Sequence, residues 1–353
     1  MTPVVGIIAN PFSARDVRRV VAQASGVQIA DRATAVMRAL AGLAAGGVGE
    51  VLMMPDRAGL VQGVERTLDR AARRGGASYP RLSVLDMPIR SGVEDTHLAA
   101  VMMARANVGA IIALGGDGTH RAVVAHCGRT PIATISTGTN NAFAELREPT
   151  VVGLAAALAA TGRAPADVAL RANKLIEVTV NGRTHIALVD VAIVSDAHVG
   201  AKALWRAETF RELYVAFAEP DLIGMAAIAG LLEPVSRREP GGLRVRLLAP
   251  GEGGARAILH APIAPGLVSP VVVADWGRLA AGESVRPATK AGSLAFDGER
   301  EISFREGDDV AVVLREGAFR SVDVAACMRC AATRGLLREA AATINPQQAV
   351  ATR

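Results

Sequence analysis

A glycine-rich turn that contains one carboxylate is the segment of this sequence best suited to chemistry. Gly115-Gly116-Asp117-Gly118-Thr119 leaves the apolar run 108–114 and enters a stretch of helical pattern. Glycines let the backbone approach a ligand closely, and the N–H groups at a helix start attract a polyphosphate. Asp117 inside such a turn can hold Mg²⁺ or take a proton from an attacking hydroxyl, and both tasks serve phosphoryl transfer. The alternative is an aspartate that only caps the next helix.

Two further polar turns follow apolar runs of the strand type. The first offers an amide, a hydroxyl and a guanidinium, from Asn10, Ser13 and Arg15. The second offers hydroxyls, amides and a flexible glycine, from Thr137, Gly138, Thr139, Asn140 and Asn141. Because ligands bind at the carboxyl ends of the strands in open α/β sheets, the three turns are expected to lie together at that edge. They predict a phosphate cradle, in which a guanidinium suits phosphate.

Strand and helix patterns alternate through the first half of the chain. Apolar runs predict strands at 4–9, 50–54, 82–87, 108–114 and 131–135. Apolar residues at helical spacing predict helices at 16–24, 58–74, 93–105 and 119–126. This rhythm predicts an α/β domain with a parallel sheet and right-handed crossovers.

The second half has the pattern of a β-rich domain. Short apolar runs predict strands at 175–180, 184–194, 243–248, 255–261, 270–274, 292–296, 309–314 and 318–324. Helical patterns are predicted at 151–160, 204–216 and 324–342, and 222–232 is rich in small residues. We therefore expect an α/β nucleotide-binding domain over 1–149 and a mostly-β, sandwich-like acceptor-binding domain over 150–323. Residues 324–353 are expected to form a terminal helix and tail that packs back on the first domain.

Composition narrows the possible functions. Of 353 residues, 50% are hydrophobic, which excludes a chain that is mostly disordered, and only 3% are aromatic, which argues against stacking platforms for single-stranded nucleic acid. The net charge of +5 comes from scattered basic residues, so no nucleic-acid partner is expected. Three cysteines and the lack of a signal or spanning pattern predict a cytoplasmic protein without a membrane partner. Cys327 and Cys330 lack a second pair, so no residues are predicted as metal ligands.

Taken together, these turns resemble a known superfamily. The Gly115–Thr119, Asn10-Pro11 and Gly138-Thr139 turns are similar to those of the NAD kinase / diacylglycerol kinase superfamily. Further stretches resemble, within it, the ATP-NAD kinase-like family of the acetoin catabolism protein X type: 6–19, 54–59, 85–96, 137–143, 187–194, 199–205, 261–266 and 296–301. The resemblance implies an active site in a cleft between the two domains. It also implies ATP and Mg²⁺ as cofactors, phosphorylation of a small-molecule hydroxyl, and a homodimer or larger homo-oligomer.

The resemblance implies roles for individual residues as well. Asp117 would activate the acceptor hydroxyl or organise the metal, and Asp297 and Glu299 of the late Asp-Gly-Glu element are further catalytic candidates. Asp190 and His120, which follows Thr119 directly, are the predicted acceptor contacts. The cofactor phosphates would be lined by Asn10, Ser13, Arg15, Gly115, Gly116, Gly118, Thr119, Thr137, Gly138, Thr139, Asn140 and Asn141.

The chain departs from these families on the acceptor side. Val189 stands where NAD kinases carry an asparagine, and the apolar 224–227 turn stands where they carry polar residues that bind the dinucleotide. Ala142 stands where lipid kinases have an aspartate. Because a ligand's polar edges would go unpaired, NAD should bind poorly. The sequence therefore predicts an ATP-dependent kinase, NAD kinase-like with an altered acceptor site. The alternatives are a lipid or isoprenoid-alcohol kinase and a non-catalytic nucleotide-binding regulatory protein linked to acetoin catabolism.

Overall fold

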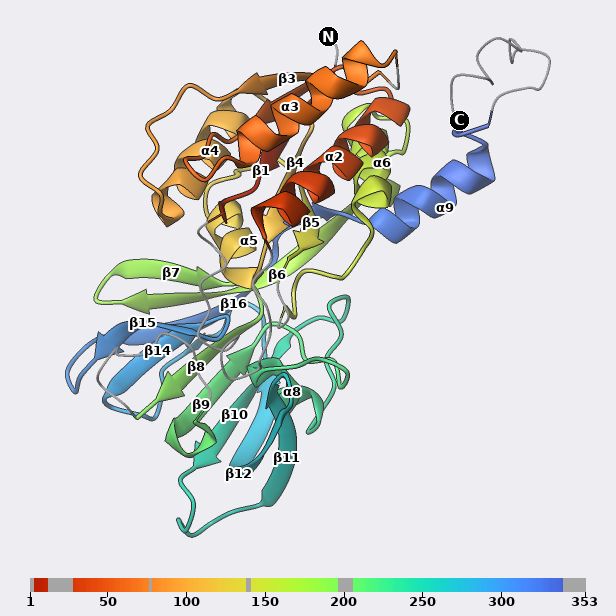
Figure 1. Cartoon of the computed structure of the whole chain (residues 1–353). Coiled ribbons are helices and arrows are strands. Elements are labelled where there is room, and N and C mark those ends of the chain that lie inside the picture. The colour runs from red at the N-terminus through yellow and green to blue at the C-terminus, as the bar shows by residue number, and fades with distance from the viewer. Residues whose placement is uncertain (1–2, 12–27, 76–77, 138–140, 196–205, 339–353) are drawn as a thin grey trace.

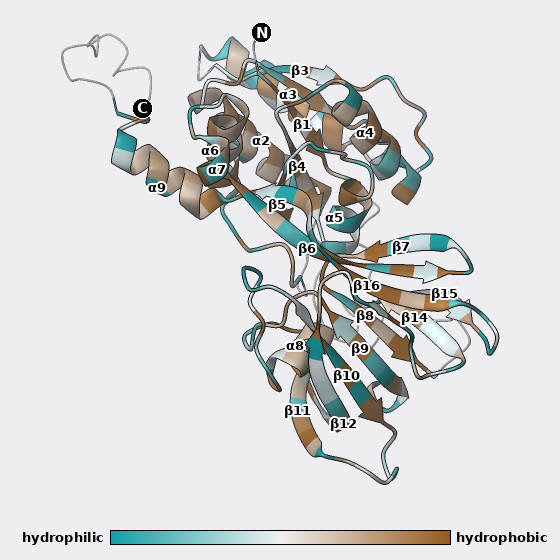
Figure 2. Ribbon diagram, turned by 180° about the vertical axis from the view of Figure 1, so that it is seen from behind, coloured by the Kyte–Doolittle hydropathy of each residue, from teal (hydrophilic) through white to brown (hydrophobic). Residues whose placement is uncertain are grey.

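The chain is arranged as an α/β part followed by a β-rich part (Figure 1). The computed structural model describes residues 3–11, 28–75, 78–137, 141–195 and 206–338. Figure 2 shows apolar residues on the helices around the first sheet and along the strands of both sheets. Among the described residues, none of the helices combines the length and the apolar character needed to span a bilayer.

A parallel sheet forms the centre of the α/β part. It contains, in spatial order, β3 (Arg81–Val84), β2 (Glu50–Met53), β1 (Val4–Ile8), β4 (Ala110–Gly115) and β5 (Ile132–Ser136). All six residues of β4 are buried, and they alternate between two cores. Ile111 and Ala113 face one core, whereas Ala110, Ile112 and Leu114 face the other. The predicted α/β architecture is confirmed.

Helices cover both faces of this sheet. On one face lie α2 (Ile29–Ala45), α3 (Leu60–Arg73) and α6 (Pro149–Ala160), and on the other lie α4 (Val93–Arg105) and α5 (Asp117–Val124). The sequence reading missed α2, which makes an unusually close contact with α6. A Cβ on Gly42 would lie 2.1 Å from the Thr150 oxygen, and one on Gly153 would lie 2.2 Å from the Ala39 oxygen. The two helices therefore pack backbone to backbone at these glycines.

The β-rich part is built on an antiparallel sheet of seven strands. Its spatial order is β11 (Ala257–Ala264), β12 (Leu267–Leu279), β10 (Gly242–Leu248), β9 (Phe210–Val215), β8 (Asp190–Val194), β14 (Gly292–Phe296) and β15 (Glu299–Phe304). One short helix, α8 (Met225–Gly230), packs against this sheet and is buried throughout. The mostly-β character predicted for the second half is confirmed.

The first sheet does not stop at the α/β part. It continues beyond β5 through β16 (Val310–Val322), β6 (Leu170–Val180) and β7 (Arg183–Ala187), and β13 (Ser284–Val285) pairs with β16. β16 is parallel to β5 at Ser321 and Ile132, and it is antiparallel to β6 along ten residue pairs. After β16 comes α9 (Val324–Arg334), which packs with α7 (Ala166–Ala169) and α6 in the core of the α/β part. The strand β16 therefore connects the α/β part and the β-rich part. The predicted domain boundaries at residues 149 and 323 stay a prediction.

Several predicted elements differ from the structure. The helix predicted at 204–216 is wrong over its described part, because Ala207–Thr209 is a single 3₁₀ turn and β9 follows it. The buried side chains of β9 and its pairing with β8 and β10 override the local helical pattern. The predicted strand 184–194 is interrupted at Leu188-Val189. The N–H groups of these two residues donate to the Asp297 carboxylate instead of to a neighbouring strand. The predicted strands 309–314 and 318–324 are one strand with an irregularity between Arg315 and Phe319.

Candidate active site

The glycine turn lies at the carboxyl edge of the parallel sheet, as the sequence predicts. Gly115 and Ser136 are paired at the ends of β4 and β5, and Gly116 precedes the first residue of α5, Asp117. The Thr137 N–H donates to the Gly115 oxygen at 3.1 Å, so the turn after β5 begins beside the glycine turn.

Some of the other predicted cradle residues lie among the described residues, and some do not. The Asn141 amide donates to the Ser136 hydroxyl at 2.7 Å. The Asn10 amide, at the end of β1, donates to Gly92 O at 2.8 Å and to the Thr96 hydroxyl at 3.1 Å, and so it fixes the start of α4. Asn10, the glycine turn, Thr137 and Asn141 thus share one sheet edge. Five predicted residues lie outside the described residues: Ser13, Arg15, Gly138, Thr139 and Asn140.

The glycines of the turn differ in how closely their neighbours approach. A Cβ on Gly115 would lie 2.4 Å from Thr119 Cβ, and one on Gly116 would lie 3.0 Å from Asn141 Oδ1. A Cβ on Gly118 would lie 4.0 Å from both carboxylate oxygens of Glu299. The turn is therefore packed tightly from within at Gly115, and it is approached by Glu299 at the first turn of α5.

Substitution of Gly115 by alanine is expected to destabilise the protein by about 1–3 kcal/mol, because the new methyl group would overlap the buried Thr119 side chain. The measurement is the urea midpoint of unfolding. The matched control is Gly63→Ala within α3, where the nearest atom to the new Cβ is 3.7 Å away. That change should be neutral or stabilising by up to about 1 kcal/mol. Equal effects of the two substitutions would contradict the packing described at Gly115.

Asp117 anchors the segment that follows β5. Its carboxylate accepts hydrogen bonds from the N–H groups of Ala142 at 2.7 Å, Phe143 at 3.1 Å and Ala144 at 3.3 Å. Burial raises the pKa of Asp117, while these three N–H groups and the charge of Arg237 act in the opposite direction. The side chain does not cap α5, whose N-cap is Gly116; it joins the glycine turn to the neighbouring turn of the cradle.

Arg237 holds the same segment from the other side, and the sequence reading missed it. Its Nη1 donates to Phe143 O at 2.7 Å, its Nη2 donates to Ala142 O, and its guanidinium lies 4.3 Å from the Phe217 ring centroid. The peptide groups at 142–143 are therefore held at their N–H groups by Asp117 and at their oxygens by an arginine of the β-rich part. No local motif marks Arg237; the contact exists only in the folded chain.

A buried lysine positions the turn that carries Arg237. The Lys174 ammonium donates to the oxygens of Ser236 at 3.1 Å, Glu239 at 2.7 Å and Gly241 at 2.7 Å. Three carbonyl acceptors match the three donors of an ammonium group. The 236–241 turn is thereby fixed to β6 and, through β6, to the large sheet.

Asp297 and Glu299 lie on opposite sides of the turn between β14 and β15. The Asp297 carboxylate accepts from the N–H groups of Leu188 at 3.0 Å and Val189 at 2.8 Å, and Arg121 Nε lies 3.8 Å from it. Burial raises the pKa of Asp297 to about 6; Arg121 lowers it, and the nearby charge of Asp117 raises it. The carboxylate oxygens of both Asp117 and Asp297 accept hydrogen bonds from backbone N–H groups. Glu299 is half-buried, and its carboxylate lies beside the glycine turn.

The two predicted acceptor contacts have different surroundings. Asp190 is buried at the start of β8, next to the Leu188-Val189 segment that Asp297 binds. His120 is 0% exposed; its Nε2 lies 3.1 Å from Ala113 O, and its ring lies 6.2 Å from that of Phe143. This placement gives His120 a part in the packing of α5 on β4 and does not support a contact with the acceptor.

The burial of His120 predicts an acid-sensitive stability. Burial lowers the pKa of His120 to about 4, below the ordinary value of 6.5. Between these values the unfolded chain binds a proton that the folded chain does not, so stability is lost as the pH falls through this window. His120→Gln should remove about 2 kcal/mol of the stability change between pH 7 and pH 5. Urea unfolding of the wild-type protein and of His120→Gln, each at pH 7 and pH 5, measures this change. Asp297, whose pKa is raised, contributes in the opposite direction, but it does so in both proteins and therefore cancels in the comparison. An identical pH dependence of stability in the wild-type protein and in His120→Gln would contradict the prediction.

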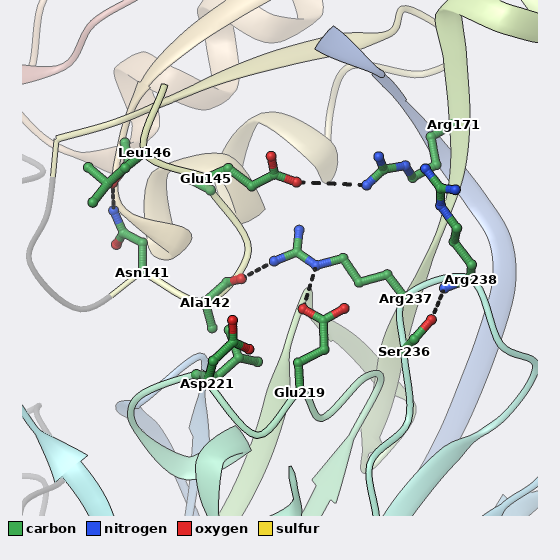
Figure 3. Close-up of a pocket in the computed structure, with 13 residues that line it drawn as sticks. Asn141, Ala142, Glu145, Leu146, Arg171, Glu219, Asp221, Ser236, Arg237 and Arg238 are labelled. Atoms are coloured by element: carbon green, nitrogen blue, oxygen red, sulfur yellow. Dashed lines mark hydrogen bonds and ion pairs between the residues drawn. The ribbon is translucent and has the colours of Figure 1, made fainter. Parts of the chain in front are cut away.

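A cavity of about 540 Å³ lies between the two parts of the chain (Figure 3). One wall is formed by the end of β5 and the segment that follows it, with Ser136, Asn141 and Leu146. The other wall is formed by β6 and the β-rich part, with Arg171, Asp221 and Arg238. Arg237 extends between these two walls, toward the Ala142 oxygen (Figure 3). The cavity therefore continues from the carboxyl edge of β5 into the cleft between the parts.

The described residues supply no metal-binding cluster of their own. Within the described ranges, no group of three or more His, Cys, Asp or Glu side chains is placed to hold a metal ion. Mg²⁺ commonly binds through one or two carboxylates together with waters and substrate phosphates. Of the carboxylates near the glycine turn, Asp117 and Asp297 accept backbone N–H groups, and Glu299 lies beside Gly118.

The fold and the glycine turn define a two-part protein of the kinase-like class. Residues 5–164 match the family model of the ATP-NAD kinase N-terminal domain. Residues 174–317 match the model of the acetoin catabolism protein X C-terminal domain. The chain is 54% identical over 345 residues to the acetoin catabolism protein X of Cupriavidus necator, a match that covers 96% of this chain and 95% of that protein. The chain belongs to the acetoin catabolism protein X family.

Two solved structures also align with most of the chain. Yeast NADH kinase complexed with NADH aligns with a TM-score of 0.47 at 12% identity, covering 97% of this chain and 90% of that chain. A putative diacylglycerol kinase from Bacillus anthracis aligns with a TM-score of 0.47 at 13% identity, covering 91% of this chain and 96% of that chain.

Proposed function

We propose that this protein transfers the γ-phosphoryl group of ATP to a hydroxyl group of a small molecule, with the glycine turn as the phosphate site and Glu299 as the general base. The observation that carries the proposal is the position of the Glu299 carboxylate beside Gly118, at the start of α5 and the carboxyl edge of the sheet. The match of residues 5–164 to an ATP-NAD kinase domain supports ATP as the donor.

In this reaction the acceptor O–H gives its proton to the Glu299 carboxylate as the acceptor oxygen attacks the γ-phosphorus. The new P–O bond forms while the bond between the γ-phosphorus and the β–γ bridging oxygen breaks, and ADP leaves with that oxygen. Backbone N–H groups at 116–118 and the partial positive charge at the start of α5 stabilise the phosphate oxygens. Mg²⁺ bound with ATP would be held by phosphate oxygens and waters and would neutralise phosphate charge, while Glu299 keeps the role of base.

Asp117 and Asp297 act as positioning residues in this proposal. Asp117 fixes the 142–144 segment against the glycine turn, and Asp297 fixes the 188–190 segment while pairing with Arg121 of α5. Both carboxylates bind to N–H groups that would otherwise be buried without an acceptor, and such groups are costly. The geometry of the site therefore depends on these two side chains even though neither takes the proton.

The experiment is incubation with ATP and Mg²⁺ of a panel that contains NAD, NADH, acetoin and small diols, with products identified by mass. Acetoin is included because the Cupriavidus necator relative is named for its catabolism and because acetoin carries a hydroxyl group. A phosphorylated product with equimolar ADP supports the proposal. ATP binding without any phosphorylated product would favour a non-catalytic nucleotide-binding regulator. Turnover only with micelle-presented alcohols would favour a lipid kinase.

A further inference from the structure

We propose that the acceptor alcohol carries an anionic group, a carboxylate or a phosphate, that binds to Arg171 and Arg238 in the cavity between the two parts. This inference rests on the proposed function and names the class of its acceptor. It is carried by the charge balance on one wall of the cavity, by a buried donor on that wall, and by the position of the cavity next to the glycine turn.

Two guanidinium groups converge on one carboxylate oxygen. Arg171 Nη2 lies 2.8 Å and Arg238 Nη2 lies 3.3 Å from the same Asp323 Oδ2. The other oxygen of Asp323 accepts the N–H of Ala326 and caps α9. Asp323, together with Glu145 at 3.9 Å from Arg171 Nη1, thus balances three arginines, because Glu145 also pairs with Arg147. A further anion between Arg171 and Arg238 would relieve the repulsion of these two guanidinium groups.

Arg171 also has a buried donor that needs an acceptor. Its Nε is shielded from solvent and has no hydrogen-bond partner among the described residues. Glu145, at 3.9 Å from Arg171 Nη1, is too distant for a hydrogen bond and also pairs with Arg147. A buried N–H group without an acceptor costs about 1–3 kcal/mol. The Arg171 side chain is 21% exposed, and a reorientation that turns Nε toward an anionic oxygen in the cavity would remove that cost.

The third arginine of the cavity is already engaged. Arg237 donates to the oxygens of Ala142 and Phe143, and its Nε lies 3.9 Å from Glu219. Figure 3 shows Arg237 directed across the cavity, whereas Arg171 and Arg238 lie together at its far wall. The latter two are therefore the residues that present positive charge to a ligand. A guanidinium binds carboxylate and phosphate oxygens through two parallel N–H groups.

The position of the cavity ties this anion to the reaction site. Asn141 lines the cavity, and its Oδ1 is the closest atom to the position of a Cβ on Gly116. Leu146, which is 85% exposed, offers an apolar surface at the opposite wall. A small anionic alcohol held by Arg171 and Arg238 would thus extend past Asn141 toward the glycine turn.

The test is isothermal titration calorimetry with three related probes in the presence of Mg²⁺ and a non-hydrolysable ATP analogue. Glycerol 3-phosphate and glycerate carry an anionic group, and glycerol does not. The wild-type protein should bind at least one anionic probe at least tenfold more tightly than glycerol. Comparison of the two anionic probes shows whether phosphate or carboxylate is preferred.

Variants of the two arginines assign the site. Arg238→Gln, at a side chain that is 69% exposed, and Arg171→Lys, which keeps the charge but removes Nε, should each weaken binding at least tenfold. The matched control is Arg183→Gln on β7, at an exposed arginine outside the cavity. Unchanged binding in both cavity variants, or no preference over glycerol in the wild-type protein, would overturn the inference. Because the calorimetry uses a non-hydrolysable ATP analogue, it does not depend on turnover, so a failure of catalysis alone is distinguishable from a failure of this site.

Discussion

Glu299→Gln is expected to lower kcat for phosphotransfer by about 10²- to 10⁴-fold, the usual contribution of a positioned general base. Glutamine has nearly the same shape as glutamate but does not accept the acceptor proton. Its position beside Gly118 should still leave room for the nucleotide. The measurement is the rate of product formation under saturating ATP and acceptor, together with ATP affinity by calorimetry. ATP affinity should change by less than about threefold.

A matched substitution separates this effect from a general loss of charge. Glu306→Gln removes a carboxylate from the same β-rich part, where Glu306 is exposed and pairs with Lys290 at 2.8 Å. It should leave kcat unchanged. If Glu299→Gln retained more than a tenth of the wild-type rate, Glu299 would not be the base, and the positions of the other two carboxylates would have to be reconsidered.

Asp117→Ala is expected to destabilise the protein by about 3 kcal/mol and to abolish measurable nucleotide binding. The substitution leaves the N–H groups of Ala142, Phe143 and Ala144 without their acceptor, at about 1–3 kcal/mol each. Relief from burying the carboxylate, whose pKa burial raises, offsets part of this loss. The measurements are the urea midpoint and ATP affinity. The urea midpoint and the ATP affinity of Asp117→Asn, which keeps one acceptor oxygen, should lie between those of the wild-type protein and those of Asp117→Ala.

This result distinguishes an anchor from a simple base. A carboxylate that only accepted a proton could be removed without loss of stability or of ATP affinity. The control is Asp69→Ala, at an exposed position of α3, which should change stability by no more than about 0.5 kcal/mol. Wild-type stability and ATP affinity in Asp117→Ala would refute the anchoring role and return Asp117 to the list of candidate bases.

The parts of the site that the sequence predicts are those fixed by local pattern. Gly115–Thr119 and Thr137 each follow an apolar strand, and parallel strands bring their carboxyl ends to one edge. Asp297 and Glu299 were predicted only through the family resemblance, because nothing in their spacing from Asp117 shows that β14 and β15 lie beside α5.

Other features are invisible in the sequence because they depend on distant contacts. Arg237 binds Phe143 from 94 residues away. The strand β9 has a helical pattern, yet its pairing with β8 and β10 decides its conformation. The helix α2 is rich in alanine, and its place in the fold depends on the close packing of its glycine, Gly42, against α6. The roles of Asp117 and Asp297 as anchors likewise appear only when the partner N–H groups are known.

The course of β16 has a consequence for synthesis of the chain on the ribosome. The edge of β5 is completed only by residues 310–322, and the core of the α/β part is completed only by α9 at 324–334. The amino-terminal half therefore emerges long before its last strand and helix exist, with an open strand edge that is prone to mispairing. Ribosome-attached chains that end before residue 310 should consequently recruit chaperones and be cut readily by proteases, and this vulnerability should disappear once the carboxyl-terminal helix has left the exit tunnel.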